Sequence, residues 1–86
     1  MKEFIYTITD PLGIHARPAG MLAKLAKEYG DTTIIIAKDG NEVKAVQLMK
    51  LMGLGVKQGD SVTVSADGAN EDAALSAMKE FFQENL

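Results

Sequence analysis

The sequence predicts an α+β open-faced sandwich, in which a four-stranded antiparallel sheet carries three helices on one face. Four stretches of the chain alternate in side-chain character or are rich in β-branched residues, as strands are. Two longer stretches repeat apolar residues with helical spacing, and a short apolar run lies between two of the strands. The resulting order, β-α-β-β-α-β-α, is typical of helices segregated to one face of an antiparallel sheet. Because 86 residues suffice for only one core, we expect a single domain over residues 1–86.

The first strand and the first helix are predicted on either side of a turn. In residues 4–9, large apolar side chains occupy every second position and should face the core. Residues 10–13 contain the proline and glycine of a turn. A helix is expected over residues 16–29, with Pro18 in its first turn, where the missing N–H has no intrahelical partner to lose. Gly30 should end this helix.

The middle of the chain predicts a hairpin and, further on, the fourth strand. Residues 32–37 are β-branched and resemble a buried strand. An Asp-Gly turn in residues 38–41 leads to a short return strand over residues 42–45. Residues 61–66 alternate cleanly between apolar and polar side chains, which indicates the fourth strand.

The last helix is expected to begin at Asn70, whose side chain would cap it. Glu71 and Asp72 then lie in the first turn, where the helix dipole favours negative charge. The apolar side chains that follow share one face of this helix: Ala74, Leu75, Met78, Phe81 and Phe82.

The run between the third and fourth strands is too apolar for its length. Leu48, Met49, Leu51 and Met52 fill four of five positions, and Gly53 ends the run. A helix of one or two turns cannot bury all of its sides against one sheet, so some of these side chains should face water. Methionine suits a surface that accommodates more than one partner.

Composition excludes several classes of protein. A net charge of −3 argues against nucleic-acid binding, and no apolar run is long enough to cross a bilayer. The N-terminus has no signal-peptide pattern, and the absence of cysteine fits a reducing compartment. We therefore expect a cytoplasmic protein that makes no membrane insertion.

The only histidine and the only arginine lie two residues apart, in Gly13-Ile14-His15-Ala16-Arg17-Pro18. His15 should stand at the start of a helix, where unpaired backbone N–H groups and the positive dipole end attract an anion. The neutral form of an imidazole has a lone pair on one ring nitrogen that can attack phosphorus. The N–H groups of Ala16 and Arg17, together with the forked Arg17 guanidinium, could then hold the phosphate oxygens.

Other interpretations of His15 must be weighed against this one. A lone histidine in such a place is often only a structural residue that caps a helix or packs in a turn. A metal site is disfavoured, because the chain has neither a second histidine nor a cysteine. No nucleophile-elbow motif surrounds any serine, so a hydrolytic triad also has no support.

A cationic stripe extends from the histidine along the first helix. Arg17, Gly20, Lys24 and Lys27 are spaced to share one helix face, and no acidic residue interrupts them before Glu28. This stripe is either an ordinary solvated face or a surface that steers an acidic partner. Gly20 costs about 1 kcal/mol of helix propensity relative to alanine. It is explained equally well by close packing within the domain and by close approach of a partner.

The histidine motif, with Met49, Met52-Gly53-Leu54-Gly55 and Lys57-Gln58-Gly59, closely resembles the HPr family, the histidine-containing phosphocarriers of the phosphoenolpyruvate-dependent sugar phosphotransferase system. The similarity covers essentially the whole chain. It implies that His15 accepts a phosphoryl group on Nδ1 from enzyme I and passes it to the EIIA domains of sugar permeases. Such a protein is a carrier and not an enzyme, and it needs no cofactor or metal. We also expect a monomer.

The resemblance also implies roles for particular residues. Arg17 would be the phosphate partner, supported by the backbone N–H of Ala16. The residues expected to bind partners are Pro18, Gly20, Lys24, Lys27, Leu48, Met49 and Met52.

Three departures from the family pattern bear on regulation and on the site. The regulatory serine of many relatives falls at Gln47, which has no hydroxyl group to phosphorylate. Leu12 replaces a small polar residue that often helps to orient the histidine. One extra residue lies between the first helix and Gln47.

An alternative function is a regulatory module that docks to a transcription factor or a metabolic enzyme.

Overall fold

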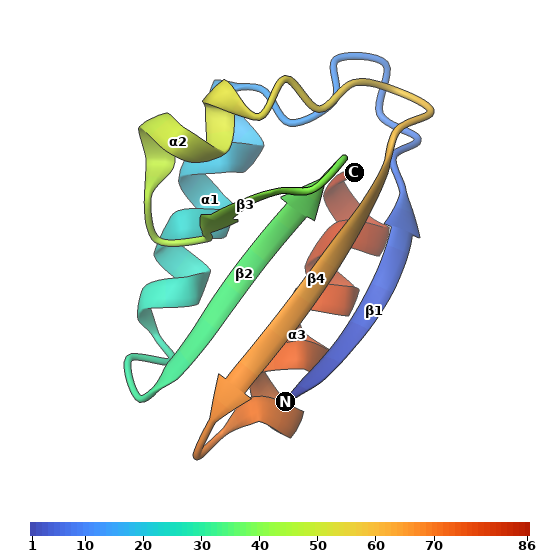
Figure 1. Ribbon diagram of the computed structural model, residues 1–86. Coiled ribbons are helices and arrows are strands. Elements are labelled where there is room, and N and C mark those ends of the chain that lie inside the picture. The colour runs from blue at the N-terminus through green and yellow to red at the C-terminus, as the bar shows by residue number, and fades with distance from the viewer.

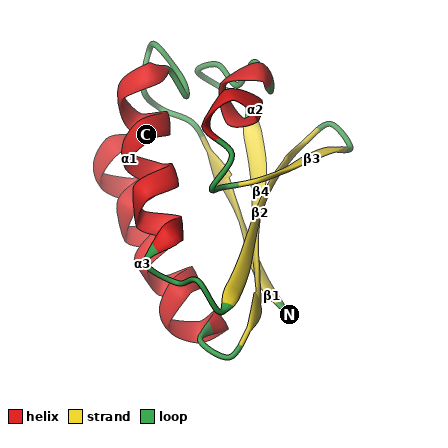
Figure 2. Ribbon diagram, turned by 90° about the vertical axis from the view of Figure 1, so that its left-hand side faces the viewer, coloured by secondary structure: helices red, strands yellow, loops and turns green.

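The computed structural model describes residues 1–86 and has the predicted order of elements (Figure 1). The four strands form one antiparallel sheet in the order β1-β4-β2-β3. All three helices lie on the same side of this sheet, so the α+β open-faced sandwich is confirmed (Figure 2). The elements are β1 (Lys2–Thr7), α1 (Ala16–Lys27), β2 (Thr32–Lys38), β3 (Asn41–Lys44), α2 (Leu48–Gly53), β4 (Ser61–Gly68) and α3 (Glu71–Asn85).

The core lies between the sheet and the helices. Val64 of the central strand β4 stands opposite Phe4 of β1 and opposite Ile36 of β2, so their inward side chains form one continuous layer. Phe82 of α3 packs edge-on against Phe4, with 6.0 Å between ring centroids, and against Tyr6, with 5.5 Å. The other face of the sheet has no cover, and Ile5 on that face is 73% exposed.

The structure corrects the predicted ends of several elements by one or two residues. The first helix ends at Lys27 and not at residue 29, because the N–H groups of Glu28 and Tyr29 bond to carbonyls only three residues back. Strand β4 runs on to Gly68, since residues 67 and 68 still pair with the start of β2. None of the three helices has both the length and the apolar character that crossing a bilayer requires.

The predicted position of the N-cap of the last helix is confirmed, but the predicted capping bond is wrong. Asn70 does occupy the N-cap position of α3, but its side chain makes no bond to the helix. Its amide nitrogen instead donates to both oxygens of Asp31, at 3.0 and 3.2 Å, and its backbone N–H donates to Thr32 Oγ1 at 3.0 Å. Asn70 therefore ties the start of α3 to the turn before β2.

Candidate functional site

His15 occupies the N-cap position of α1, with extended backbone angles of φ −100° and ψ −177°. Its carbonyl accepts the first backbone bond of the helix, from the N–H of Ala19 at 2.9 Å. The N–H groups of Ala16 and Arg17 have no acceptor within the chain, and Pro18 has no N–H. The His15 side chain makes no capping bond, so the half-buried ring leaves these two donors open to a bound anion.

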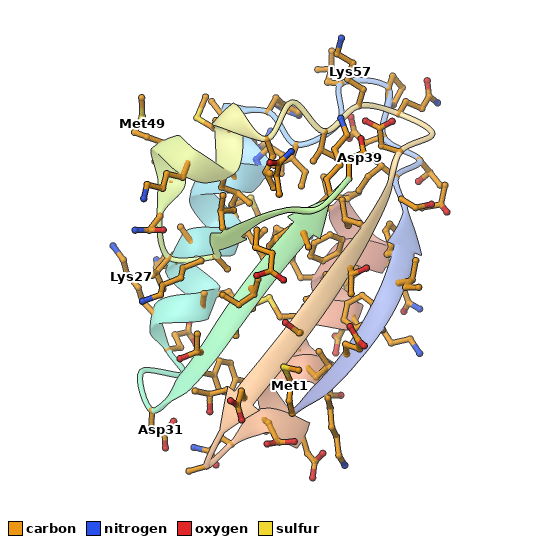
Figure 3. All side chains as sticks on the ribbon, viewed as in Figure 1. Met1, Lys27, Asp31, Asp39, Met49 and Lys57 are labelled. Carbon is orange, nitrogen blue, oxygen red and sulfur yellow. The ribbon has the colours of Figure 1, made fainter.

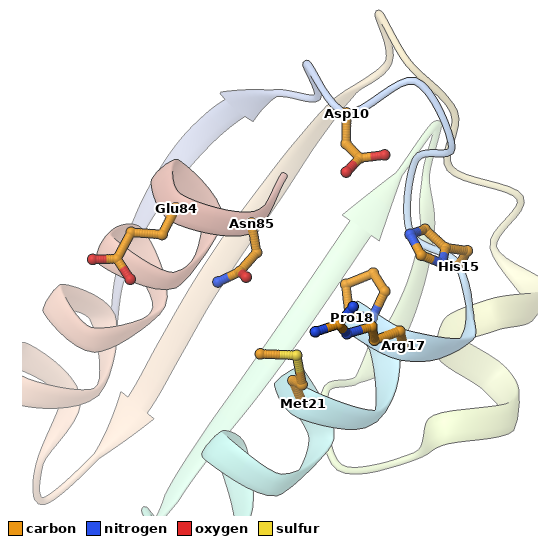
Figure 4. Close-up of a pocket in the computed structure, with 7 residues that line it drawn as sticks. All are labelled: Asp10, His15, Arg17, Pro18, Met21, Glu84 and Asn85. Atoms are coloured by element: carbon orange, nitrogen blue, oxygen red, sulfur yellow. The ribbon is translucent and has the colours of Figure 1, made fainter.

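A hollow of about 320 Å³ lies beside the imidazole (Figure 4). His15 and Arg17 face it from the start of α1, and Asp10 faces it from the turn after β1. Glu84 and Asn85 line it from the end of α3, although the Glu84 carboxylate points away from His15 (Figure 4). The remaining lining residues are Pro18 and Met21. Arg17 is the only lysine or arginine at the hollow, so one forked cation shares this hollow with the ring.

Sequence reasoning missed four of these lining residues, for different reasons. Asp10 had a local signal, because it lies in the turn that leads to the histidine. Its Oδ1 accepts the Leu12 N–H at 2.8 Å, while the Leu12 side chain is 70% exposed and adds no polar group to the site. Glu84 and Asn85 had no such signal, since only the topology brings the end of α3 to the start of α1.

The cationic stripe is exposed as its spacing predicts. Arg17, Lys24 and Lys27 all face solvent, and none of them forms an ion pair. A β-carbon built on Gly20 would meet no atom within 4 Å outside its own helix. Close packing within the domain therefore does not explain this glycine, and close approach of a partner stays a prediction.

The short helix α2 divides its apolar side chains between the core and the surface. Leu51 is fully buried, whereas Leu48 and Met52 are each 38% exposed and Met49 is 79% exposed. The expectation that some of this run faces water is confirmed. Because α2 contacts α1, the exposed apolar side chains lie next to the element that carries His15 and the cationic stripe (Figure 3).

The other two predicted positions differ in exposure. Pro18 is buried, so only the part of its ring that lines the hollow could meet a partner. Gln47 is exposed at the N-cap of α2, where its side chain makes no capping bond. No group of three or more metal-ligating side chains occurs in the structure.

Comparison with known proteins identifies the family of this chain. A family model described as "PTS HPr component phosphorylation site" matches residues 2–84. The phosphocarrier protein HPr of Mycoplasma genitalium is 41% identical over 85 residues, which cover 99% of this chain and 97% of the relative. A crystal structure of HPr from Thermoanaerobacter tengcongensis superposes with a TM-score of 0.92 at 36% identity, covering 98% of this chain and 93% of that one.

A dimeric form also occurs among the similar structures. The crystal structure of an HPr dimer from Thermoanaerobacter tengcongensis has a TM-score of 0.77 at 36% identity, covering 98% of this chain and 95% of that one. The monomer expected from the sequence thus stays a prediction. The family match over residues 2–84 and the 41% identical relative, together with a fold that places His15 at an open helix start, establish that the chain belongs to the HPr family of phosphocarrier proteins.

Proposed function

We propose that this protein accepts a phosphoryl group on His15 from enzyme I and delivers it to EIIA domains of sugar permeases. The observation that carries the proposal is the start of α1, where two N–H groups without acceptors directly follow His15, and where His15 and Arg17 line the same hollow. The phosphorylation-site family model covers this segment.

The chemistry follows from these groups. With the proton on Nε2, the Nδ1 lone pair of a neutral His15 attacks phosphorus as the bond to the donor enzyme breaks, and a P–N bond forms. The product carries close to two negative charges. The N–H groups of Ala16 and Arg17 and the Arg17 side chain stabilise these charges, which lowers the free energy of the phosphohistidine. Asp10 faces the same hollow, and its negative charge opposes tight retention of the phosphate, so the group can leave again.

The partners would dock on two adjoining surfaces. The cationic stripe of Arg17, Lys24 and Lys27 suits an acidic surface, which steers the encounter and speeds association. The exposed apolar side chains of Leu48, Met49 and Met52 supply an apolar contact surface, from which water is displaced when a partner docks. We propose a cytoplasmic location on the same grounds, because these partners act there.

A labelling assay tests the phosphoryl acceptor directly. Incubation with phosphoenolpyruvate and enzyme I should give an acid-labile phosphohistidine, and His15→Ala should abolish it. Arg17→Ala should slow transfer at unchanged stability, since Arg17 is exposed and makes no ion pair. Lys79→Ala, which removes an exposed cation from α3, is the matched control. Equal labelling of His15→Ala and the unaltered protein would reject the proposal.

The docking surface is tested separately by Met49→Glu. Met49 is 79% exposed, so a carboxylate there should leave folding intact while weakening the encounter with enzyme I. Stopped-flow transfer kinetics should then show a higher half-saturating concentration. Unchanged kinetics would remove α2 from the proposed interface.

A further inference from the structure

The segment that ends in His15 is held from behind by a second loop. We call residues 8–14 the histidine loop and residues 55–60 the support loop, which lie side by side at the same end of the molecule (Figure 1). The Ile8 N–H donates to the Asp60 carbonyl and the Gly59 N–H donates to the Ile8 carbonyl, each at 2.9 Å. At the other end of the histidine loop, the Ile14 N–H donates to the Val56 carbonyl at 3.2 Å.

The backbones of the two loops pack tightly against each other at Gly13, two residues before the histidine. A β-carbon on Gly13 would stand 2.2 Å from the Val56 carbonyl oxygen and 2.8 Å from the Lys57 Cα. Gln58 adds a side-chain bond from its Nε2 to the Thr9 carbonyl at 3.1 Å. Any movement of the support loop is therefore passed to the backbone that leads into His15.

An ion pair holds the support loop at both of its ends. Lys38 Nζ donates to the Gly55 carbonyl at 2.9 Å and contacts Asp60 Oδ2 at 3.0 Å. The same Oδ2 accepts the Lys57 N–H at 2.8 Å. Lys38 and Asp60 are only 19% and 33% exposed, whereas at least one partner in every other ion pair is more than half exposed. This pair is thus the best shielded from solvent in the molecule.

The position of Lys38 is itself well determined. It is the last residue of β2 and stands opposite Asn41 in the hairpin. Asp39 and Gly40 form the turn with φ values of 51° and 83°, the two positive angles of a tight hairpin turn. The bond from the Lys57 N–H, with the help of Lys38, also lowers the pKa of Asp60 from its ordinary value of 3.8, so the carboxylate is charged at neutral pH.

We propose that Lys38 and Asp60 are positioning residues for His15, acting through the support loop. The inference rests on the proposed function of His15, because only transfer at that ring makes its placement matter. Phosphoryl transfer is sensitive to such placement, since a misplacement of about 1 Å can cost on the order of a hundredfold in rate. The pair does not line the hollow beside His15.

The test compares Lys38→Met with Lys2→Met. Both changes remove one lysine from one ion pair, but Lys2 pairs with Asp72 at the far end of the sheet. Lys38→Met should slow transfer from enzyme I about tenfold at saturating enzyme, with little change in the half-saturating concentration. Lys38→Arg should restore much of the rate, and Asp60→Asn should resemble Lys38→Met. Lys2→Met should transfer phosphate at the rate of the unaltered protein.

Two measurements on the unphosphorylated protein separate positioning from docking. In Lys38→Met, the ring resonances of His15 should shift at fixed pH, and the Ile14 amide should exchange with solvent faster. A loss of rate without either change would overturn the proposal, and so would an unaltered rate. If the unaltered protein is never labelled on His15, the proposed function fails. Unchanged ring resonances and Ile14 exchange in Lys38→Met would still overturn the link to His15.

Discussion

Helices α1 and α3 both begin shortly after a glycine that has a positive φ angle. In each, a glycine lies two residues before the N-cap with positive φ, 65° at Gly13 and 151° at Gly68. A β-carbon on Gly13 would lie 2.2 Å from one carbonyl oxygen, and a β-carbon on Gly68 would lie 2.5 Å from another. Both helix starts are thus pinned by a neighbouring strand or loop that tolerates no side chain at this point.

The two helix starts differ in charge. The first turn of α3 contains Glu71 and Asp72, which neutralise the positive dipole end, whereas the first turn of α1 contains no acid and one arginine. A carboxylate in this position contributes roughly 0.3–1 kcal/mol. Helix α1 forgoes that stabilisation and keeps its donors unoccupied. The comparison shows that the first turn of α3 carries two acids, whereas the first turn of α1 carries one cation beside N–H groups that have no acceptor.

The largest effects are expected where the two helices are alike. Gly13→Ala and Gly68→Ala should each lower the free energy of unfolding by about 3 kcal/mol, because a β-carbon meets backbone and the φ angle is strained. Urea unfolding measures both losses. In the fraction that remains folded, only Gly13→Ala should also slow phosphoryl transfer. A loss below about 1 kcal/mol at either site would show that the neighbouring backbone can move away.

The next effect comes from making the two helix starts alike in charge. Ala16 is exposed, so Ala16→Glu adds a carboxylate to the first turn of α1 without a steric cost. It should stabilise the protein by about 0.5 kcal/mol. Transfer from enzyme I should fall about tenfold or more, because the new charge competes with phosphate for the same donors.

Ala73→Glu is the matched control at the start of α3. Ala73 is also exposed, but Glu71 and Asp72 already occupy this turn, so the gain in stability should be smaller. Transfer should be unaffected. If Ala16→Glu transfers phosphate at the normal rate, the open donors of α1 have no part in holding it.

Most of what distinguishes the two helix starts could be predicted from local features of the sequence. The spacing of apolar residues is enough to place both helices, and the acids of α3 and the lone arginine of α1 are visible without coordinates. The role of Asn70 was not predictable, because its amide turns to Asp31, which is 39 positions away in the chain. Among the residues around His15, Asp10 and the start of α1 lie close to it in the sequence, whereas Glu84 and Asn85 reach the hollow only through tertiary structure.

The same limit applies to the support loop. Lys38, Gly55 and Asp60 are ordinary loop and hairpin residues in the sequence, and nothing in their spacing links them to His15. Only the antiparallel return of β4 beside β1 brings residues 55–60 against the histidine loop. Such long-range contacts carry no periodic signature, so sequence patterns cannot reveal them.

The smallest expected effect concerns Lys2, which pairs with Asp72 in the first turn of α3. A hydrogen bond to Asp72, followed by its charge, raises the pKa of Lys2 above the ordinary value of 10.5. A raised lysine pKa means that the folded state favours the ammonium, so its contribution is fully present below pH 10.5 and fades as the pH rises through the raised value. The difference in unfolding free energy between the unaltered protein and Lys2→Met should therefore shrink in urea titrations from neutral pH to above pH 10.5. A difference that stays constant would assign the effect of Lys2 to packing of its alkyl chain, and the start of α3 would then depend on Glu71 and Asp72 alone.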